Sequence, residues 1–193
     1  MKYRSILLFG APGAGKGTQG KILGVIPNFF HCACGDVFRN LRADSPLGKV
    51  FIEYSSRGQL VPDATTVKLW RQFIDNSTKI GRFHPDDDTL VLDGIPRNVR
   101  QAEMLRDTLD VAAVFYLKSA NEKNLIQRIQ RRAIKENRLD DANLDIIRER
   151  LKTYEKETLP LLNFYGSKLV HRIKADQSPA KVLGDILRIA VKQ

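Results

Sequence analysis

The sequence predicts an α/β fold in which a doubly wound parallel sheet of five strands is covered by helices on both faces. Short apolar runs alternate along the chain with segments of helical periodicity, which is the pattern of such a sheet. The runs are continuously apolar, as expected for strands buried on both faces. A chain of 193 residues is long enough to form one domain with a sizeable core.

Five apolar runs define the expected strands, at residues 5–9, 29–33, 89–92, 111–117 and 168–173. Helical patterns fill the gaps between them, at about 15–25, 36–43, 46–56, 63–76, 98–109, 121–135, 143–163 and 179–191. About 55 residues separate the second run from the third, which is too long for one crossover helix. We therefore expect a small helical insertion there.

The composition is that of an ordinary soluble domain, with 42% hydrophobic and 28% charged residues. No stretch approaches the ~20 apolar residues that a membrane span needs. The apolar run near the N-terminus, at residues 5–9, is too short for a typical secretory signal, so we expect a cytoplasmic protein without a membrane partner. Cys32 and Cys34 fit neither a disulfide framework nor a four-ligand zinc site. We interpret both as strand residues that share a face.

The formal net charge is +10, from 32 basic and 22 acidic residues. Such an excess suits any polyanion: nucleic acid, an anionic membrane surface or nucleotide phosphates. The densest basic cluster lies at residues 128–138. Taken alone, this cluster is either a solvated helix face or a phosphate-binding surface.

A glycine-rich segment, G-A-P-G-A-G-K-G-T at residues 10–18, follows the first expected strand and opens the first expected helix. Glycines allow a tight turn whose N–H groups converge on an anion, and a helix N-terminus adds positive partial charge. Lys16 would reach the β and γ phosphates of a nucleotide. Gly17 separates the lysine from Thr18, which argues against an ordinary GTPase or motor ATPase. The expected phosphate-binding residues are Gly13, Ala14, Gly15, Lys16, Gly17 and Thr18.

The third expected strand ends in a carboxylate, Asp93. In a parallel sheet this residue emerges beside the phosphate loop, where a Mg²⁺ ion would sit. We expect the ion to be bound mainly through nucleotide phosphates and water, with Asp93 acting through water. The next residue is Gly94, whereas a hydrolytic ATPase often places its water-activating glutamate there. The chain also lacks the N-K-x-D motif that recognises guanine.

Several blocks together resemble adenylate kinases. They are G-A-P-G-A-G-K-G-T-Q from Gly10, C-G-D-V-F-R from Cys34, G-Q-L-V-P-D from Gly58 and D-G-I-P-R from Asp93. The likeness continues through Arg138 and Arg150 to about residue 180, nearly the whole chain. It implies transfer of the γ-phosphoryl group of MgATP to AMP, giving two ADP.

The resemblance also assigns roles to arginines. Phosphoryl transfer has a charge-rich transition state, so catalysis rests on positioning and positive charge, and a guanidinium binds phosphate oxygens bidentately. By resemblance Arg39 and Arg97 hold the acceptor phosphate, and Arg128 and Arg132 close over ATP. The basic cluster is then a phosphate clamp. The implied catalytic residues are Lys16, Asp93, Arg97, Arg132, Arg138 and Arg150.

The remaining nucleotide contacts follow from the same resemblance. The Gln101 amide can donate and accept at once, which fits the Watson–Crick edge of adenine, although the pattern also allows a helix-surface glutamine. Gln177 resembles the position whose backbone meets the ATP adenine, and it joins Arg128 and Arg132 in the implied ATP-binding set. The implied acceptor-binding residues are Cys34, Arg39, Gln59, Leu60, Val61, Gly94, Ile95, Pro96, Arg97, Gln101, Arg138 and Arg150.

The resemblance divides the chain into a core of residues 1–34, 68–127 and 139–193, a monophosphate-binding insertion at 35–67 and a short lid at 128–138. A lid of this size has no room for a zinc site, so we expect Mg²⁺ with ATP and no structural zinc. The sequence departs from the family pattern at three positions. Cys34 replaces a hydroxyl residue, Ile95 replaces an aromatic, and Asn137 stands where glycine is common.

Three alternatives remain open. A kinase for UMP or CMP shares the loop and the D-G-x-P-R-N block, and Asn98 fits it; that group usually has asparagine at position 101, so Gln101 favours AMP. A nucleic-acid-binding P-loop protein would interleave aromatic with basic residues, and residues 121–138 contain no aromatic. A non-catalytic nucleotide sensor would not need the full set of basic site residues. We expect a monomer that acts on ATP and AMP.

Overall fold

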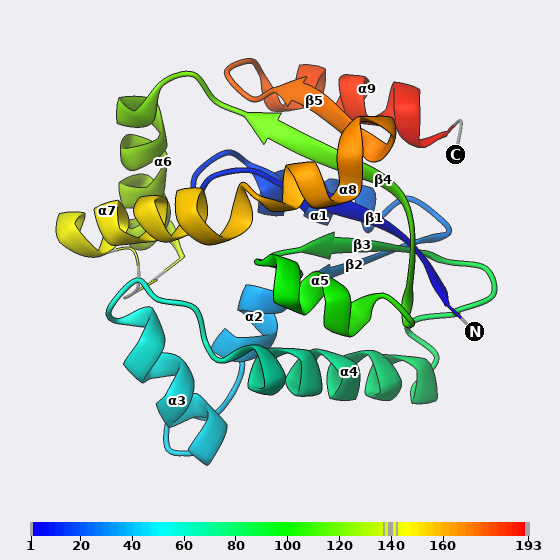
Figure 1. Ribbon diagram of the computed structural model, residues 1–193, viewed down its shortest axis with the longest axis horizontal. Helices are drawn as coiled ribbons and strands as arrows, with labels where there is room; N and C mark the ends of the chain where they lie inside the picture. Colours follow the sequence, from blue (N-terminus) through cyan, green and yellow to red (C-terminus); the bar gives the residue numbers. More distant parts are fainter. Residues whose placement is uncertain (1, 137, 139–140, 142, 192–193) are drawn as a thin grey trace.

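The computed structural model describes residues 2–136, 138, 141 and 143–191. Asn137 of the expected lid lies outside the described residues. The sheet has five strands in the order β2-β3-β1-β4-β5, and all neighbouring pairs are parallel. The strands are β1 (Tyr3–Phe9), β2 (Phe29–Ala33), β3 (Thr89–Asp93), β4 (Leu109–Lys118) and β5 (Val170–Lys174). The predicted five-stranded parallel sheet is therefore confirmed (Figure 1).

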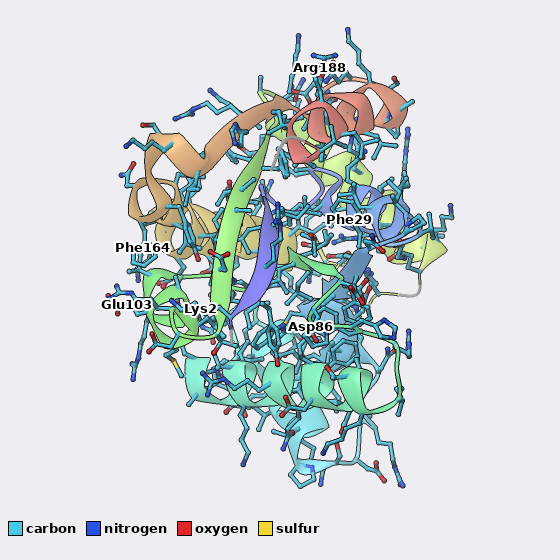
Figure 2. The ribbon with its side chains drawn as sticks, turned by 90° about the vertical axis from the view of Figure 1, so that its right-hand side faces the viewer. Lys2, Phe29, Asp86, Glu103, Phe164 and Arg188 are labelled. Atoms are coloured by element: carbon cyan, nitrogen blue, oxygen red, sulfur yellow. The ribbon has the colours of Figure 1, made fainter. Side chains whose placement is uncertain are left out.

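Helices cover both faces of this sheet. One face is covered by α1 (Lys16–Leu23), α6 (Glu122–Lys135), α7 (Leu144–Thr153) and α9 (Pro179–Ala190). The other is covered by α2 (Cys34–Arg39), α4 (Asp63–Lys79), α5 (Val99–Leu105) and α8 (Leu161–Leu169). Figure 2 looks along the sheet from the side and shows Arg188 of α9 and Glu103 of α5 on opposite sides of the strands.

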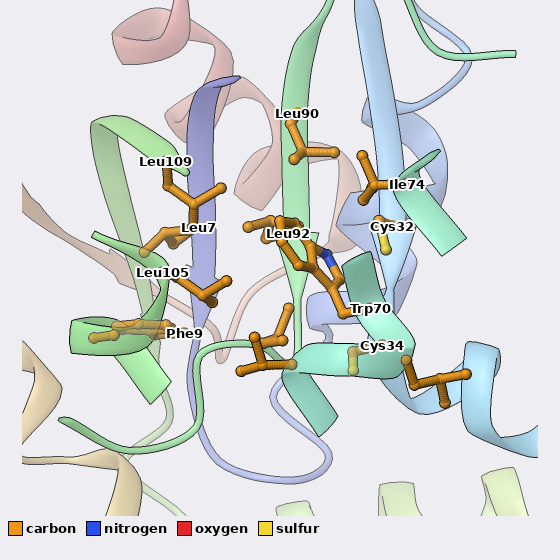
Figure 3. Packing of buried hydrophobic residues seen from close by; sticks show 14 of the residues in the cluster. Leu7, Phe9, Cys32, Cys34, Trp70, Ile74, Leu90, Leu92, Leu105 and Leu109 are labelled. Atoms are coloured by element: carbon orange, nitrogen blue, oxygen red, sulfur yellow. The ribbon is translucent and has the colours of Figure 1, made fainter. Parts of the chain in front are cut away.

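Alternation along β1 divides the core into two apolar clusters. Leu7 and Phe9 pack with the α4 side, whereas Ile6 and Leu8 pack with the α1 side. Because successive side chains of a strand point to opposite faces, a continuous apolar run fills both clusters at once. Figure 3 shows the first cluster, in which the fully buried Trp70 of α4 lies against the sheet.

The two cysteines belong to different elements. Cys32 lies on β2, but Cys34 is the first residue of α2, so the prediction that both are strand residues is wrong for Cys34. The strand ends one residue before it, and the chain turns directly into the helix. Both thiols are free and buried in the same apolar cluster (Figure 3).

The expected helix at 143–163 is interrupted. It consists of α7, a π-helical segment η2 (Tyr154–Thr158) and the start of α8, which continues to Leu169. Pro160 lies two residues after the π-helical segment, and proline removes a helical N–H donor, so the regular pattern changes there. Because α8 extends to Leu169, β5 begins at Val170, two residues later than expected. The expected helix at 98–109 is also shorter, since Leu109 already belongs to β4.

The predicted insertion between β2 and β3 is helical. It contains α2, α3 (Pro46–Ser55) and the beginning of α4. Ser45 caps α3, because its Oγ accepts a hydrogen bond from the Gly48 N–H at 3.0 Å. Helix α4 runs without a break past residue 67, where the expected insertion ends. The first turn of α4 therefore falls within the expected insertion, and the rest of the helix packs on the sheet.

Across the described part of the chain, none of the helices is long and apolar enough to cross a membrane.

Candidate active site

A cavity of about 680 Å³ opens at the carboxyl ends of β1, β2 and β3. Ligands of open α/β sheets bind at this edge, where the strand order changes direction. The lining contains every expected site residue except Ile95, whose side chain is fully buried in the α4-side cluster. The structure therefore brings together residues that the sequence spreads from Gly13 to Gln177.

The phosphate loop connects β1 to α1 at one end of this cavity. Gly13 and Gly15 have φ angles of 82° and 98°, a left-handed conformation that glycine adopts without a steric cost. A Cβ on Gly13 would also approach the Leu125 carbonyl oxygen to 2.8 Å. Helix α1 begins without a side-chain cap and has no acidic residue in its first turn. Its N–H groups are therefore available to an anion in the cavity.

Lys16 extends back along the phosphate loop. Its Nζ donates to the carbonyl oxygens of Gly10 and Ala11 at 2.7 and 3.0 Å. Burial lowers the pKa of Lys16 to about 8; Asp93 opposes this shift, and nearby arginines add to it. An anion beside Lys16 would favour its charged form.

Asp93 ends β3 and faces the first turn of α1. Its Oδ2 lies 3.6 Å from the position that a Cβ would take on Gly17. Among the described residues, no group of three or more His, Cys, Asp or Glu side chains could hold a metal ion. Asp93 places one carboxylate in the cavity lining beside the phosphate loop, and carboxylate oxygens are groups that Mg²⁺ prefers.

Asp141 organises two of the expected catalytic arginines. Its carboxylate is fully buried. It accepts from Nε of Arg132 at 2.8 Å, contacts Nη2 of the same residue at 2.7 Å, and contacts Nη1 of Arg150. One carboxylate thus fixes two guanidinium groups, from α6 and α7, at the wall of the cavity. Sequence reasoning assigned Asp141 no role, because nothing local distinguishes it from a surface aspartate.

A second carboxylate, Asp36, joins the two sides of the cavity. It accepts from Arg39 of the same helix at 2.6 Å and from Arg138 at 3.4 Å. Burial alone would raise the pKa of Asp36, but the hydrogen bond and charge of Arg39, with the charge of Arg138, hold it below its usual value. Burial and the neighbouring Arg39 and Arg132 lower the pKa of Arg138. This ion pair therefore links α2 to Arg138, which follows α6 in the sequence.

The far end of the cavity is apolar as well as basic. Cys34, Phe38 and Val61 are buried there and line it. Phe38 stacks on Phe51 with ring centroids 5.3 Å apart. Burial raises the pKa of the Cys34 thiol to about 12, so this thiol stays neutral at physiological pH. The apolar walls and the adjacent arginines suit a molecule with a flat base and an anionic end.

Arg97 is held from both sides at the edge of this region. Its Nε donates to the Gly94 carbonyl at 3.0 Å, and its own carbonyl accepts from Thr158 Oγ1 at 2.7 Å. Thr158 ends the π-helical segment η2. The widened turn that interrupts the expected long helix therefore contacts the loop that carries Arg97.

Gln101 lies against the cavity and is only 1% exposed, which excludes the interpretation of a helix-surface glutamine. Its Oε1 accepts from the Arg97 N–H at 2.8 Å, and its Nε2 donates to Asp63 Oδ1 at 2.9 Å. Asn98 Nδ2 donates to the same oxygen at 3.0 Å. Sequence reasoning did not single out Asp63 as a partner of Gln101, because 38 residues separate them.

The loop before α9 lines the cavity on the side of the phosphate loop. Gln177 Nε2 donates to Asp185 Oδ2 at 2.7 Å, and Arg128 Nη1 donates to the Ala175 carbonyl at 3.4 Å. Arg131 and Lys135 line the cavity too, although sequence reasoning gave them no individual role. The basic cluster of α6 therefore faces the cavity in part.

The fold and the site define a P-loop phosphotransferase. The phosphate loop, the apolar side chains of Cys34, Phe38 and Val61, and several arginines line one cavity. The family model for adenylate kinase matches residues 8–170, and the chain belongs to the adenylate kinase family.

Individual relatives agree over nearly the full length. The adenylate kinase of Flavobacterium psychrophilum is 35% identical, over 88% of this chain and 88% of the relative. That of a Cyanothece species is 37% identical, over 95% and 93%. That of Flavobacterium johnsoniae is 39% identical, over 83% and 84%.

Proposed function

We propose that this chain transfers the γ-phosphoryl group of MgATP to AMP and so forms two ADP. The observation that carries the proposal is that one cavity is lined both by the phosphate loop and by the apolar region around Gln101. An enzyme that joins two nucleotides end to end needs this arrangement, because the two phosphate chains must meet in line.

At the donor end we assign the ATP phosphates to the N–H groups of Gly13–Thr18 and to Lys16. Arg128 and Arg132 would close over the nucleotide, and the loop around Gln177 would meet its base. Asp141 supports this assignment, because it fixes Arg132 beside Arg150. Buried hydrogen-bonded guanidinium groups are pre-organised to stabilise charge that develops in the transition state.

At the acceptor end we assign the AMP phosphate to Arg39 and Arg97, with Arg138 and Arg150 near the point of transfer. The segment Gln59–Val61 would form one wall for the base, and Gly94 and Pro96 would face it from the core. Ile95 would not touch the base but would support the Gly94–Pro96 wall from beneath, because its side chain is buried. Cys34 would contact the acceptor without a hydroxyl group.

The residues present fit a Mg²⁺ ion that enters with ATP. Asp93 offers the carboxylate beside the phosphate loop, and Thr18 offers a hydroxyl on α1. The ion would neutralise phosphate charge. Asp93 itself would orient water at this point and partly balance the positive charge of Lys16, consistent with its opposing effect on the lysine pKa.

We further propose that residues 35–67 and the lid at 128–138 close over the bound nucleotides. Closure would exclude water, which competes with AMP for the phosphoryl group. The Asp36–Arg138 contact supports this idea, since it joins the two segments directly. We also propose a monomer that works in the cytoplasm. We propose, in addition, that opening of these segments limits turnover; relaxation-dispersion data showing opening faster than turnover would contradict this.

The test is a comparison of acceptors. Purified protein with MgATP is mixed with AMP, CMP, UMP or GMP in separate reactions, and ADP formation is measured. The fastest reaction should be that with AMP. A preference for CMP or UMP would replace the proposal by the pyrimidine kinase alternative, and no transfer to any acceptor would favour a nucleotide sensor.

A further inference from the structure

The amide of Gln101 is held at both of its polar atoms before any ligand binds. Its Oε1 accepts from the backbone N–H of Arg97, and its Nε2 donates to the carboxylate of Asp63. A backbone N–H can only donate and a carboxylate can only accept. The two partners therefore allow one orientation of the amide and oppose the orientation turned by 180°.

This arrangement also defines which hydrogen-bonding groups of the Gln101 amide remain free for a ligand. An amide oxygen has two lone pairs and an amide nitrogen has two hydrogens. One of each is used within the protein, so Gln101 keeps one acceptor and one donor for a ligand in the cavity that it lines. Their order in space is set by Asp63 and Arg97.

That order distinguishes two classes of base. Adenine presents an amino donor beside a ring-nitrogen acceptor, whereas hypoxanthine presents a carbonyl acceptor beside a ring N–H donor. A freely turning glutamine could pair with either class by rotating its amide. A fixed glutamine forms hydrogen bonds with one class of base. Against the other class it places donor against donor and acceptor against acceptor.

We propose that Asp63 is a specificity-determining positioning residue, which fixes the Gln101 amide so that the acceptor site selects amino bases and rejects oxo bases. This inference rests on the proposed function, because it takes Gln101 to contact the acceptor base. It adds a residue that acts through Gln101 and so decides between AMP and IMP.

The surroundings of Asp63 suit this role. Asp63 is the first residue of α4, and its side chain is 17% exposed. Asn98 caps α5 through the Gln101 N–H at 2.8 Å and also donates to Asp63 Oδ1. Arg100 Nε lies 4.0 Å from the other carboxylate oxygen. The network therefore joins the start of α4 to the start of α5, two helices that pack side by side (Figure 1).

The experiment measures kcat/KM for AMP and for inosine 5′-monophosphate with saturating MgATP. In Asp63→Ala the ratio of AMP to IMP should fall about tenfold or more, because a hydrogen bond to a charged group is lost from the fixed orientation. KM for ATP should stay within about twofold. Asp63→Asn keeps an acceptor but not the charge, so its ratio should fall by less, about threefold.

Asn98→Ser is the matched control. Serine can still cap α5, and the Gln101–Asp63 hydrogen bond is left in place, so the ratio should stay within about twofold of the parent. An equal loss of both activities in Asp63→Ala, or an unchanged ratio, would overturn the inference. If Asp63→Ala does not fold, the ratio in Asp63→Asn decides. Failure of the parent protein to phosphorylate AMP would instead overturn the proposed function.

Discussion

The donor and acceptor ends of the cavity are built from different parts of the chain. At the proposed donor end, the backbone of Gly13–Thr18 and the N-terminus of α1 would provide the anion-binding groups, and Lys16 is anchored on the carbonyls of its own loop. At the proposed acceptor end, the binding groups would be side chains such as Arg39, Arg97 and Gln101, and each of these is oriented by another residue. The donor end is thus a local structure, whereas the acceptor end depends on contacts between separate helices.

The largest effect should come from breaking the donor end. Lys16→Met removes the one charge inside the phosphate loop and should lower kcat about 10³-fold or more, since loss of a transition-state charge partner typically has this size. The fold should survive, with a melting temperature no more than about 5 °C below that of the parent. Steady-state kinetics and calorimetry check both expectations.

Lys168→Met provides the control for that change, because Lys168 is an exposed lysine outside the cavity. It should leave turnover unchanged. Substantial activity in Lys16→Met would show that the backbone of the loop suffices, and the contrast between the two ends of the cavity would then lose its main support.

A smaller effect concerns the proton on Lys16. Its folded pKa is about 8, against 10.5 for the free side chain, mainly because of burial. The unfolded chain therefore holds more protons between these two values, so the free energy of unfolding should rise by up to about 3 kcal/mol as the pH increases through this window. Below pH 8 the buried charge lowers stability by the same amount.

Binding of ATP should reverse this shift, because phosphate favours the charged lysine. Nucleotide binding should then take up about half a proton at pH 8 and more at higher pH. Calorimetric titrations in buffers of different ionisation enthalpy measure this uptake. The same uptake in Lys16→Met would assign the proton to another group.

The contrast between the two ends also explains which features of the structure could be predicted from the sequence. The five strands are continuous apolar runs, and a local pattern of that kind is sufficient to place them. The phosphate loop is equally local. The expected helix at 143–163 is wrong in its middle, where a π-helical segment precedes Pro160 and Thr158 donates to the distant Arg97 carbonyl, a contact that a local pattern does not reveal.

Side-chain partners at the site could not be predicted in the same way. Asp141 is nine residues from Arg132 and from Arg150. This separation does not bring two side chains together on a single helix, so the sequence gives no sign of the contacts. Asp63 reaches Gln101 only because α4 and α5 pack together. The D-G-I-P-R pattern likewise does not reveal that Ile95 points into the core while Arg97 lines the cavity.

The smallest effect should come from a single substitution at the acceptor end, at Cys34. Cys34→Ser exchanges a neutral thiol for a hydroxyl of similar size at the first position of α2, where the side chain lines the cavity. One added hydrogen bond from the neutral hydroxyl to the charged acceptor phosphate should lower KM for AMP by roughly tenfold. KM for ATP should not change, because the substitution is confined to the acceptor end.

Cys32→Ser is the matched control, since Cys32 is equally buried but lies on β2 outside the cavity lining. The same chemical change there should leave KM for AMP unaltered and should lower stability by about 1–3 kcal/mol, because a hydroxyl replaces a thiol in an apolar cluster. If both variants changed KM for AMP alike, the effect would come from the packing of β2 and α2. A decrease confined to Cys34→Ser would show that the acceptor end is limited by a single side-chain group, in contrast to the backbone-built donor end.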